Sequence, residues 1–442
     1  MVTETNTHSS SFISERFVVA AIGIALVAGF GLGAVLFATL ALGLPVGVWW
    51  LAAAQAHGHI QLFGWAGLMV FGVGLHFLPR LRGAPLVGAR LIPAVLSLLV
   101  AGLVIRMIAQ PALAAVAPAD GTLTGVTATL FPLASILELA GATLGIGILV
   151  ATGRRGGPIG TRAGLVPVLP LIATSFVALW IALALNAIGA LLPGVPPGLL
   201  PANLDTAIVQ IGFTGFLVPI AIAISARTFP LYFWTPVPAT RWLWGELAAL
   251  IAGLMLRLIG IWGAAPALTT LGLFLEGGAL LGFIVSLGVL HRRGSPPNPR
   301  RVVPASERAS TLLIVPAYGW LGVAGIAQVA AGLAGVARFA APPPDLERHA
   351  LGAGFITLLI LGMGLRMLPG FQKRKPPPAT ASWLAVGFAH AAALLRVLPV
   401  LVAWLALSTR NSAFEAVLAL SGVLGLAAVA TFAVALARAE RR

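Results

Sequence analysis

Histidines are the residues of this sequence best suited to bind a metal or a haem. His57 and His59 lie two residues apart in the segment AHGHIQLF, and His349 begins the segment HALGAGFITLL. At about 100° of rotation per residue, two such side chains would project about 200° apart on a helix, toward two different clefts. Imidazole suits iron, copper and zinc. The spacing therefore indicates metal or haem binding inside an apolar segment.

The same histidines also have a structural interpretation. A lone histidine on an apolar helix is commonly a hydrogen-bonded core residue, and this alternative stays open for His57 or His59 taken singly. His390, in GFAHAAALL, is equally open: it is either an extra ligand or a buried hydrogen-bonded imidazole. A second histidine on one helix and a related third in His349 favour the ligand interpretation.

Ionisable residues recur inside the apolar segments. One arginine and one glutamate occur in each third of the chain: Arg106 and Glu138, Arg257 and Glu276, and Arg396 and Glu415. Charges in a bilayer are costly unless they are paired, so we expect an ion pair between neighbouring helices in each third. The alternative is that Arg106 or Arg396 binds an anionic group such as a haem propionate, which a planar guanidinium grips well.

The elements that carry these residues are copies of one unit. Residues 59–79, 210–230 and 349–369 align without gaps at shifts of 151 and 139 residues, and the same shifts carry Arg106 onto Arg257 and Arg396. One column of this alignment holds His59, Gln210 and His349. Three repeats are predicted, at about 14–155, 162–293 and 306–442. Glutamine is a poor metal ligand, so function is expected where this column differs between the repeats.

The composition identifies a membrane protein. Of 442 residues, 59% are hydrophobic and 9% are charged, which leaves too little polar surface for a water-soluble globule. Long continuous apolar runs exclude a β-barrel, whose strands alternate. We predict an all-α, polytopic membrane domain over residues 1–442, with four helices in each pseudo-symmetric repeat. The twelve predicted spans are 18–44, 48–78, 91–115, 129–153, 164–192, 203–229, 240–262, 267–290, 309–336, 346–369, 380–406 and 414–437.

The net charge of +15 reflects loops rather than a nucleic-acid surface. Basic residues form short clusters between apolar runs, such as Arg80 with Arg82 and Arg292 with Arg293, and these clusters fall on one side of the predicted membrane. The positive-inside rule then places both termini in the cytoplasm. The chain has no cysteine, which excludes covalent c-type haem, iron-sulfur clusters and thiolate copper sites.

Three segments resemble one known family. HGHIQLFGWAGLMVFGVGLHFLPRLRG from His57, RTFPLY at 227–232 and HALGAGFITLLILGMGLRM at 349–367 look like the NnrS family. These are twelve-helix bacterial inner-membrane proteins of the superfamily of haem-copper oxidase subunit I, linked to nitric oxide metabolism and described as containing haem and copper. The resemblance implies an oxidase-like fold, the bacterial cytoplasmic membrane and a role in nitric oxide response or tolerance.

The resemblance also implies a cofactor site. One or two b-type haems are expected, with a bis-histidine haem held by His57 or His59 from the second helix and by His349 from the tenth. Arg106 or Arg396 would bind a propionate. The expected partners are the lipid bilayer and a small gas or an electron donor.

Copper is implied less fully by this resemblance. The available nitrogens are the second-helix histidine not used by haem and His390, whereas the oxidases take copper ligands from helices 6 and 7. Residues 203–262 contain no histidine. Oxidase-type reduction of oxygen or nitric oxide is therefore not supported.

Two other functions stay open on the sequence alone. A membrane transporter would also combine repeats, glycine-rich helices and polar residues at depth, although transporters commonly have two inverted halves rather than three parallel copies. A cofactor-free structural relative of the oxidases would explain the missing copper ligands. Such a relative would be colourless.

Overall fold

The computed structural model describes residues 5–117, 121–157, 165–192, 196–295, 300, 302–337, 340–405 and 411–440, with side chains from residue 15 onward. Within these residues all regular structure is helical and no strand occurs, which confirms the all-α prediction. Twelve helices there are long and apolar enough to cross a membrane, as predicted. Prediction and structure agree to the residue for Thr240–Trp262.

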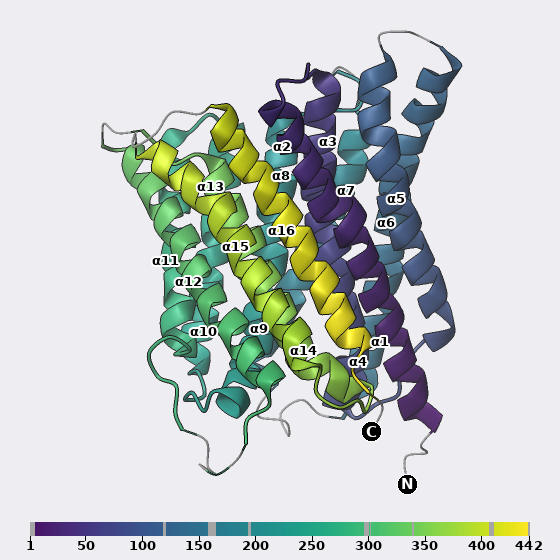
Figure 1. Cartoon of the computed structure of the whole chain (residues 1–442), viewed down its shortest axis with the longest axis vertical. Coiled ribbons are helices and arrows are strands. Elements are labelled where there is room, and N and C mark those ends of the chain that lie inside the picture. Colours follow the sequence, from purple (N-terminus) through teal and green to yellow (C-terminus); the bar gives the residue numbers. More distant parts are fainter. Residues whose placement is uncertain are drawn as a thin grey trace. The chain divides into compact units, whose positions relative to one another are not determined.

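The spans are built from single helices or from pairs joined by a π-helical turn (Figure 1). In chain order the α-helices are α1 Thr5–Ile24, α2 Leu32–Ala41, α3 Val48–His59, α4 Gly67–Arg82, α5 Ile92–Val116, α6 Thr122–Arg155, α7 Leu169–Leu191, α8 Ala202–Gln210, α9 Val218–Tyr232, α10 Thr240–Trp262, α11 Pro266–Leu287, α12 Ala305–Ala334, α13 Pro344–His349, α14 Leu358–Phe371, α15 Ala379–Trp404 and α16 Ser412–Ala437.

Four π-helical segments interrupt these spans. Three of them begin at the residue directly after His59, Gln210 and His349. A π-turn widens a helix and is found preferentially at functional sites. The hydrophobic pattern did not predict these turns, which are η1 Ala25–Gly31, η2 Ile60–Ala66, η7 Ile211–Leu217 and η8 Ala350–Thr357.

The chain divides into two compact units. Unit 1 comprises residues 1–163 and 176–212, and unit 2 comprises residues 164–175 and 213–442. In unit 1, α5 packs along α6, α4 contacts α1 and α6, and α3 contacts α5. In unit 2, α10 packs along α11, α12 contacts α11 and α14, and α15 runs beside α16 (Figure 1).

Glycines allow the closest of these helix pairs to form. A Cβ on Gly102 of α5 would lie 2.5 Å from Cγ of Glu138 and 2.7 Å from the carbonyl oxygen of Ala134. A Cβ on Gly253 of α10 would lie 2.8 Å from the backbone nitrogen of Glu276. Small residues at helix contacts are typical of membrane proteins. In both units, therefore, a glycine brings a glutamate against the arginine-bearing helix.

Candidate functional site

His59 is the last residue of α3 and lies in the interior of unit 1, only 4% exposed. Its Nε2–H donates to Oε2 of Glu138 on α6 at 2.5 Å, and its ring lies 4.7 Å from the ring of Phe63. Glu138 is itself 1% exposed. A carboxylate on one ring nitrogen fixes the tautomer and orients the ring, as it does for metal-ligating histidines.

Arg106 on α5 is fully buried in the same unit. Its Nη1 donates to Oδ1 of Asn186 on α7 at 2.6 Å, and its guanidinium carbon lies 5.3 Å from the ring centre of Phe131. The predicted ion pair between Arg106 and Glu138 is wrong. Both side chains are described, and Glu138 accepts from His59 while Arg106 binds Asn186.

Several buried atoms of these four residues have no hydrogen-bond partner. We call His59, Arg106, Glu138 and Asn186 the His59 cluster. Its partnerless atoms are Nδ1 of His59, Nε and Nη2 of Arg106, Oε1 of Glu138 and Nδ2 of Asn186. Buried polar atoms are almost always satisfied, and leaving one unsatisfied costs about 1–3 kcal/mol. A cluster of such atoms is therefore a candidate binding site for a polar or anionic group.

His57 points away from this cluster, as the predicted separation of about 200° requires. Its Nδ1–H donates to the carbonyl oxygen of Gly29 at 3.0 Å. Its ring lies against Gly33, where an added Cβ would come 2.8 Å from Cε1. A backbone carbonyl on Nδ1 is a frequent orienting contact of ligand histidines, so His57 also keeps a geometry suited to ligation.

His349, the last residue of α13, belongs to a second carboxylate arrangement in unit 2. Its Nδ1 lies 3.0 Å from Oδ1 of Asp345, four residues earlier. Arg396 on α15 holds the same carboxylate through two bonds of 2.7 and 2.8 Å. Asp345 thus orients His349 as Glu138 orients His59. Arg396 is committed to Asp345, and its predicted pairing with Glu415 stays a prediction.

His390 on α15 is a hydrogen-bonded imidazole. Its Nε2–H donates to the carbonyl oxygen of Leu312 at 2.8 Å. This contact is the hydrogen bond of the structural alternative, although His390 is half-buried rather than buried, and it occupies the nitrogen that most often binds metals. A role for His390 toward copper stays a prediction.

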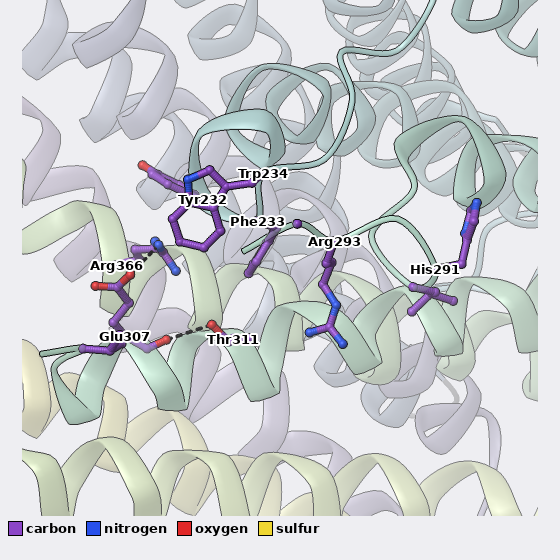
Figure 2. A pocket seen from close by; sticks show the side chains of 11 residues that line it. Tyr232, Phe233, Trp234, His291, Arg293, Glu307, Thr311 and Arg366 are labelled. Carbon is purple, nitrogen blue, oxygen red and sulfur yellow. Dashed lines mark hydrogen bonds and ion pairs between the residues drawn. The ribbon is translucent and has the colours of Figure 1, made fainter. Parts of the chain in front are cut away.

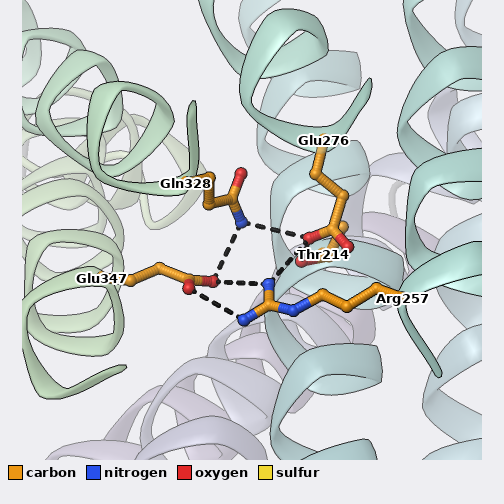
Figure 3. Close-up of polar contacts among 5 residues, drawn as sticks. All are labelled: Thr214, Arg257, Glu276, Gln328 and Glu347. Atoms are coloured by element: carbon orange, nitrogen blue, oxygen red, sulfur yellow. Dashed lines mark hydrogen bonds and ion pairs between the residues drawn. The ribbon is translucent and has the colours of Figure 1, made fainter. Parts of the chain in front are cut away.

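The predicted ion pair between Arg257 and Glu276 is confirmed, and it belongs to a network of more residues than expected. Nη1 of Arg257 lies 3.2 Å from Oε2 of Glu276, and the guanidinium also grips both oxygens of Glu347 at 3.1 and 3.2 Å. Nε2 of Gln328 donates to both carboxylates at 2.9 and 3.1 Å (Figure 3). The hydroxyl of Thr214 reaches Glu276 at 3.4 Å. We call these five residues the Arg257 network.

A pocket of about 460 Å³ lies elsewhere in unit 2 (Figure 2). Its Arg366 pairs with Glu307 at 2.7 Å and lies 4.3 Å over the ring of Tyr232. Trp234 at its wall has a φ of 52°, a strained value for a tryptophan. None of the predicted haem or metal ligands and none of the predicted propionate partners lines it. The pocket therefore offers aromatic walls and an arginine already bound to a carboxylate, and it is a weaker candidate than the His59 cluster.

No family model matches the chain, and none of the curated proteins matches it. The candidate roles of the His59 cluster, of His349 and of the Arg257 network therefore rest on the chemistry of these residues and on the resemblance carried by their sequence segments.

Proposed function

We propose that this chain is a haem-binding protein of the bacterial inner membrane, similar to the NnrS family and acting in nitric oxide response or tolerance. The observation that carries the proposal is the set of partnerless atoms in the His59 cluster. A buried imidazole nitrogen and two buried guanidinium nitrogens in one unit are the donors that an axial ligand and a propionate partner require. A haem presents an iron and two carboxylates to the protein that binds it.

The predicted haem ligands and propionate partners differ in which atoms they could offer to a haem. His59, with Nε2 bound to Glu138, has Nδ1 as its second ring nitrogen, and His349, with Nδ1 bound to Asp345, has Nε2. Arg106 suits a propionate better than Arg396 does, because Arg396 already grips Asp345 with two bonds. His57 and His59 belong to unit 1 and His349 to unit 2. Bis-histidine ligation by His349 and a second-helix histidine is part of the proposal.

The π-helical turns support the proposed triplication and the oxidase-like arrangement. They follow directly after each residue of the column His59, Gln210 and His349. A helix that widens at the same repeat position three times is expected if one unit was copied, and π-turns favour functional sites. A bound haem would supply an iron able to exchange one electron or to bind a small gas. Catalytic turnover is not part of the proposal.

A visible spectrum tests the proposal directly. The full-length protein is expressed with ample haem, purified in detergent and measured as reduced minus oxidised. We expect sharp α and Soret bands, lost in both H59A and H349A and retained in H291A, which replaces an exposed histidine outside the clusters. Loss of the bands in H57A rather than H59A would assign the ligand to His57.

The outcome also separates the alternatives. A folded, colourless protein would overturn haem binding and leave the transporter or the cofactor-free relative. Arg106 offers an independent check, because R106M keeps every histidine. If a propionate uses its free nitrogens, R106M should lower haem affinity and shift the Soret band without abolishing it.

A further inference from the structure

The Arg257 network has an unequal number of positive and negative groups. One guanidinium faces the two carboxyl groups of Glu276 and Glu347, and no member of the network is more than 8% exposed. An uncompensated carboxylate is strongly disfavoured in a low-dielectric interior, so such a group takes up a cation or a proton instead. Two ionised carboxylates beside one arginine would leave one such charge.

Hydrogen-bond geometry distinguishes the two carboxyl groups. Both oxygens of Glu347 accept from the forked guanidinium of Arg257, which is the pattern of an ionised carboxylate. Glu276 accepts only at Oε2, from Arg257, Gln328 and Thr214, and its Oε1 is buried with no partner (Figure 3). One accepting oxygen and one that receives no donor is the pattern of a carbonyl oxygen and a hydroxyl in a protonated acid.

Gln328 gives a second, independent indication. Its side chain is fully buried, and its amide nitrogen donates to both carboxyl groups. Its Oε1 also has no hydrogen-bond partner. The partnerless buried atoms of this network are thus acceptors, whereas those of the His59 cluster include several nitrogens. Because neither Oε1 of Glu276 nor Oε1 of Gln328 receives a hydrogen bond, we expect an additional hydrogen atom in the network.

The other charged groups do not remove the imbalance. The charges that act on Glu276 are Arg257 on α10 and Glu347 on α13. A second cation, Arg348, acts on Glu347, but it is not among the charges that act on Glu276. The remaining contacts of Glu276, from α12 and from η7, are made by the uncharged Gln328 and Thr214.

We propose that the Arg257 network is a proton-binding site within the membrane-spanning part of unit 2, with the proton on Oε1 of Glu276. Release leaves a carboxylate on Glu276 and transfers the proton to solvent, and no other bond changes. Glu276 stays protonated as long as the ionised Glu347 neutralises the charge of Arg257.

Infrared spectroscopy of the full-length protein in phosphatidylcholine vesicles tests this site. The carbonyl stretch of a protonated carboxylic acid lies above the bands of a carboxylate, and it shifts downward in D2O if the proton exchanges. We expect such a band at neutral pH in the wild type and its loss in E276Q. E246Q is the matched control, because Glu246 is a glutamate of α10 outside the network and accepts a hydrogen bond from Ser286. It should keep the Glu276 band.

E347Q is the decisive variant, because Glu276 is intact in it. With one carboxyl group left for Arg257, Glu276 should ionise and the band should disappear. Retention of the band in E347Q, or identical carbonyl regions in the wild type and E276Q, would overturn the proposal. If E276Q does not fold, E347Q against E246Q decides in the same way. Spectra in choline buffer with NaCl or KCl added should be unchanged, and loss of the band on addition would assign the site to a metal cation.

Discussion

The two units use the same pair of residue types in opposite ways. Arg106 and Glu138 in unit 1 are the counterparts of Arg257 and Glu276 in the predicted repeats, and both pairs are positioned by a glycine on the arginine-bearing helix. Arg257 binds its glutamate directly, whereas Arg106 does not. In unit 1, His59 binds Glu138 instead.

The difference coincides with the column in which the predicted repeats diverge. In the predicted repeats the residue aligned with His59 is Gln210, which lies in unit 1 and carries no imidazole. The imidazole of His59 occupies Glu138 and leaves Arg106 with unused donors, while Glu276 keeps its arginine. The two units thus differ in which side chain binds the glutamate: an imidazole in unit 1 and a guanidinium in unit 2.

Removal of the Arg257 side chain should destabilise the folded protein more than any other substitution considered. R257M leaves the Glu347 carboxylate buried without its cation, and breaking such a pair costs about 3–5 kcal/mol. We expect little folded protein on fluorescence-detected size exclusion. R106M should be milder, because Arg106 makes one hydrogen bond to Asn186 rather than two ion pairs. Equal losses in the two variants would contradict the assigned difference between the units.

The next largest difference in stability should be between glutamine substitutions of Glu138 and Glu276. E138Q removes the negative charge nearest to His59 and Arg106, and an uncompensated buried cation should cost about 3 kcal/mol. E276Q should cost much less, because glutamine resembles a protonated acid in shape. Thermal melting in detergent at neutral pH measures both. A larger loss in E276Q than in E138Q would reverse the comparison.

Much of the fold was predictable, because long apolar runs determine spans almost unaided. The π-turns were not, since one extra residue in a turn leaves a continuous apolar run unchanged. The pair of Arg257 with Glu276 was predictable from the recurring columns. The pair of Arg106 with Glu138 was predicted by the same argument and is wrong, because a repeat pattern cannot rank His59 against an arginine for one carboxylate.

The missed residues of the candidate sites differ in how visible they were. Asp345 precedes His349 by four residues, a spacing that places two side chains on one helical face and could have been read from the sequence. Glu347 was visible as a carboxylate inside a span. Asn186 and Gln328 gave no signal, since neither belongs to a recurring column and their roles depend on how separate helices pack.

The packing glycines should show a smaller effect that is common to both units. G102A and G253A place a methyl group within 3 Å of a neighbouring helix, and overpacking of this kind should cost about 2 kcal/mol. G278A is the control, because nothing lies within 4 Å of a Cβ at that position. Melting temperatures should fall in the first two variants only. Tolerance of G253A would show that α10 and α11 can separate without loss of the ion pair.

An exposed ion pair of unit 2 should give the smallest effect and so shows what burial contributes. Lys375 and Glu440 lie 2.8 Å apart, with side chains 58% and 73% exposed. The hydrogen bond from Lys375, with its positive charge, lowers the pKa of Glu440 below its ordinary value. A carboxyl group with a lowered folded-state pKa stabilises the fold above its unfolded pKa, and that contribution is lost as the pH falls through the folded value.

E440Q should therefore melt almost as the wild type does at neutral pH and identically in acid, because exposed pairs contribute little. The backbone bond from Lys375 to the carbonyl oxygen of Glu440 also remains. A loss in E440Q as large as that in R257M would mean that charge pairing alone, without burial, accounts for the behaviour of the Arg257 network.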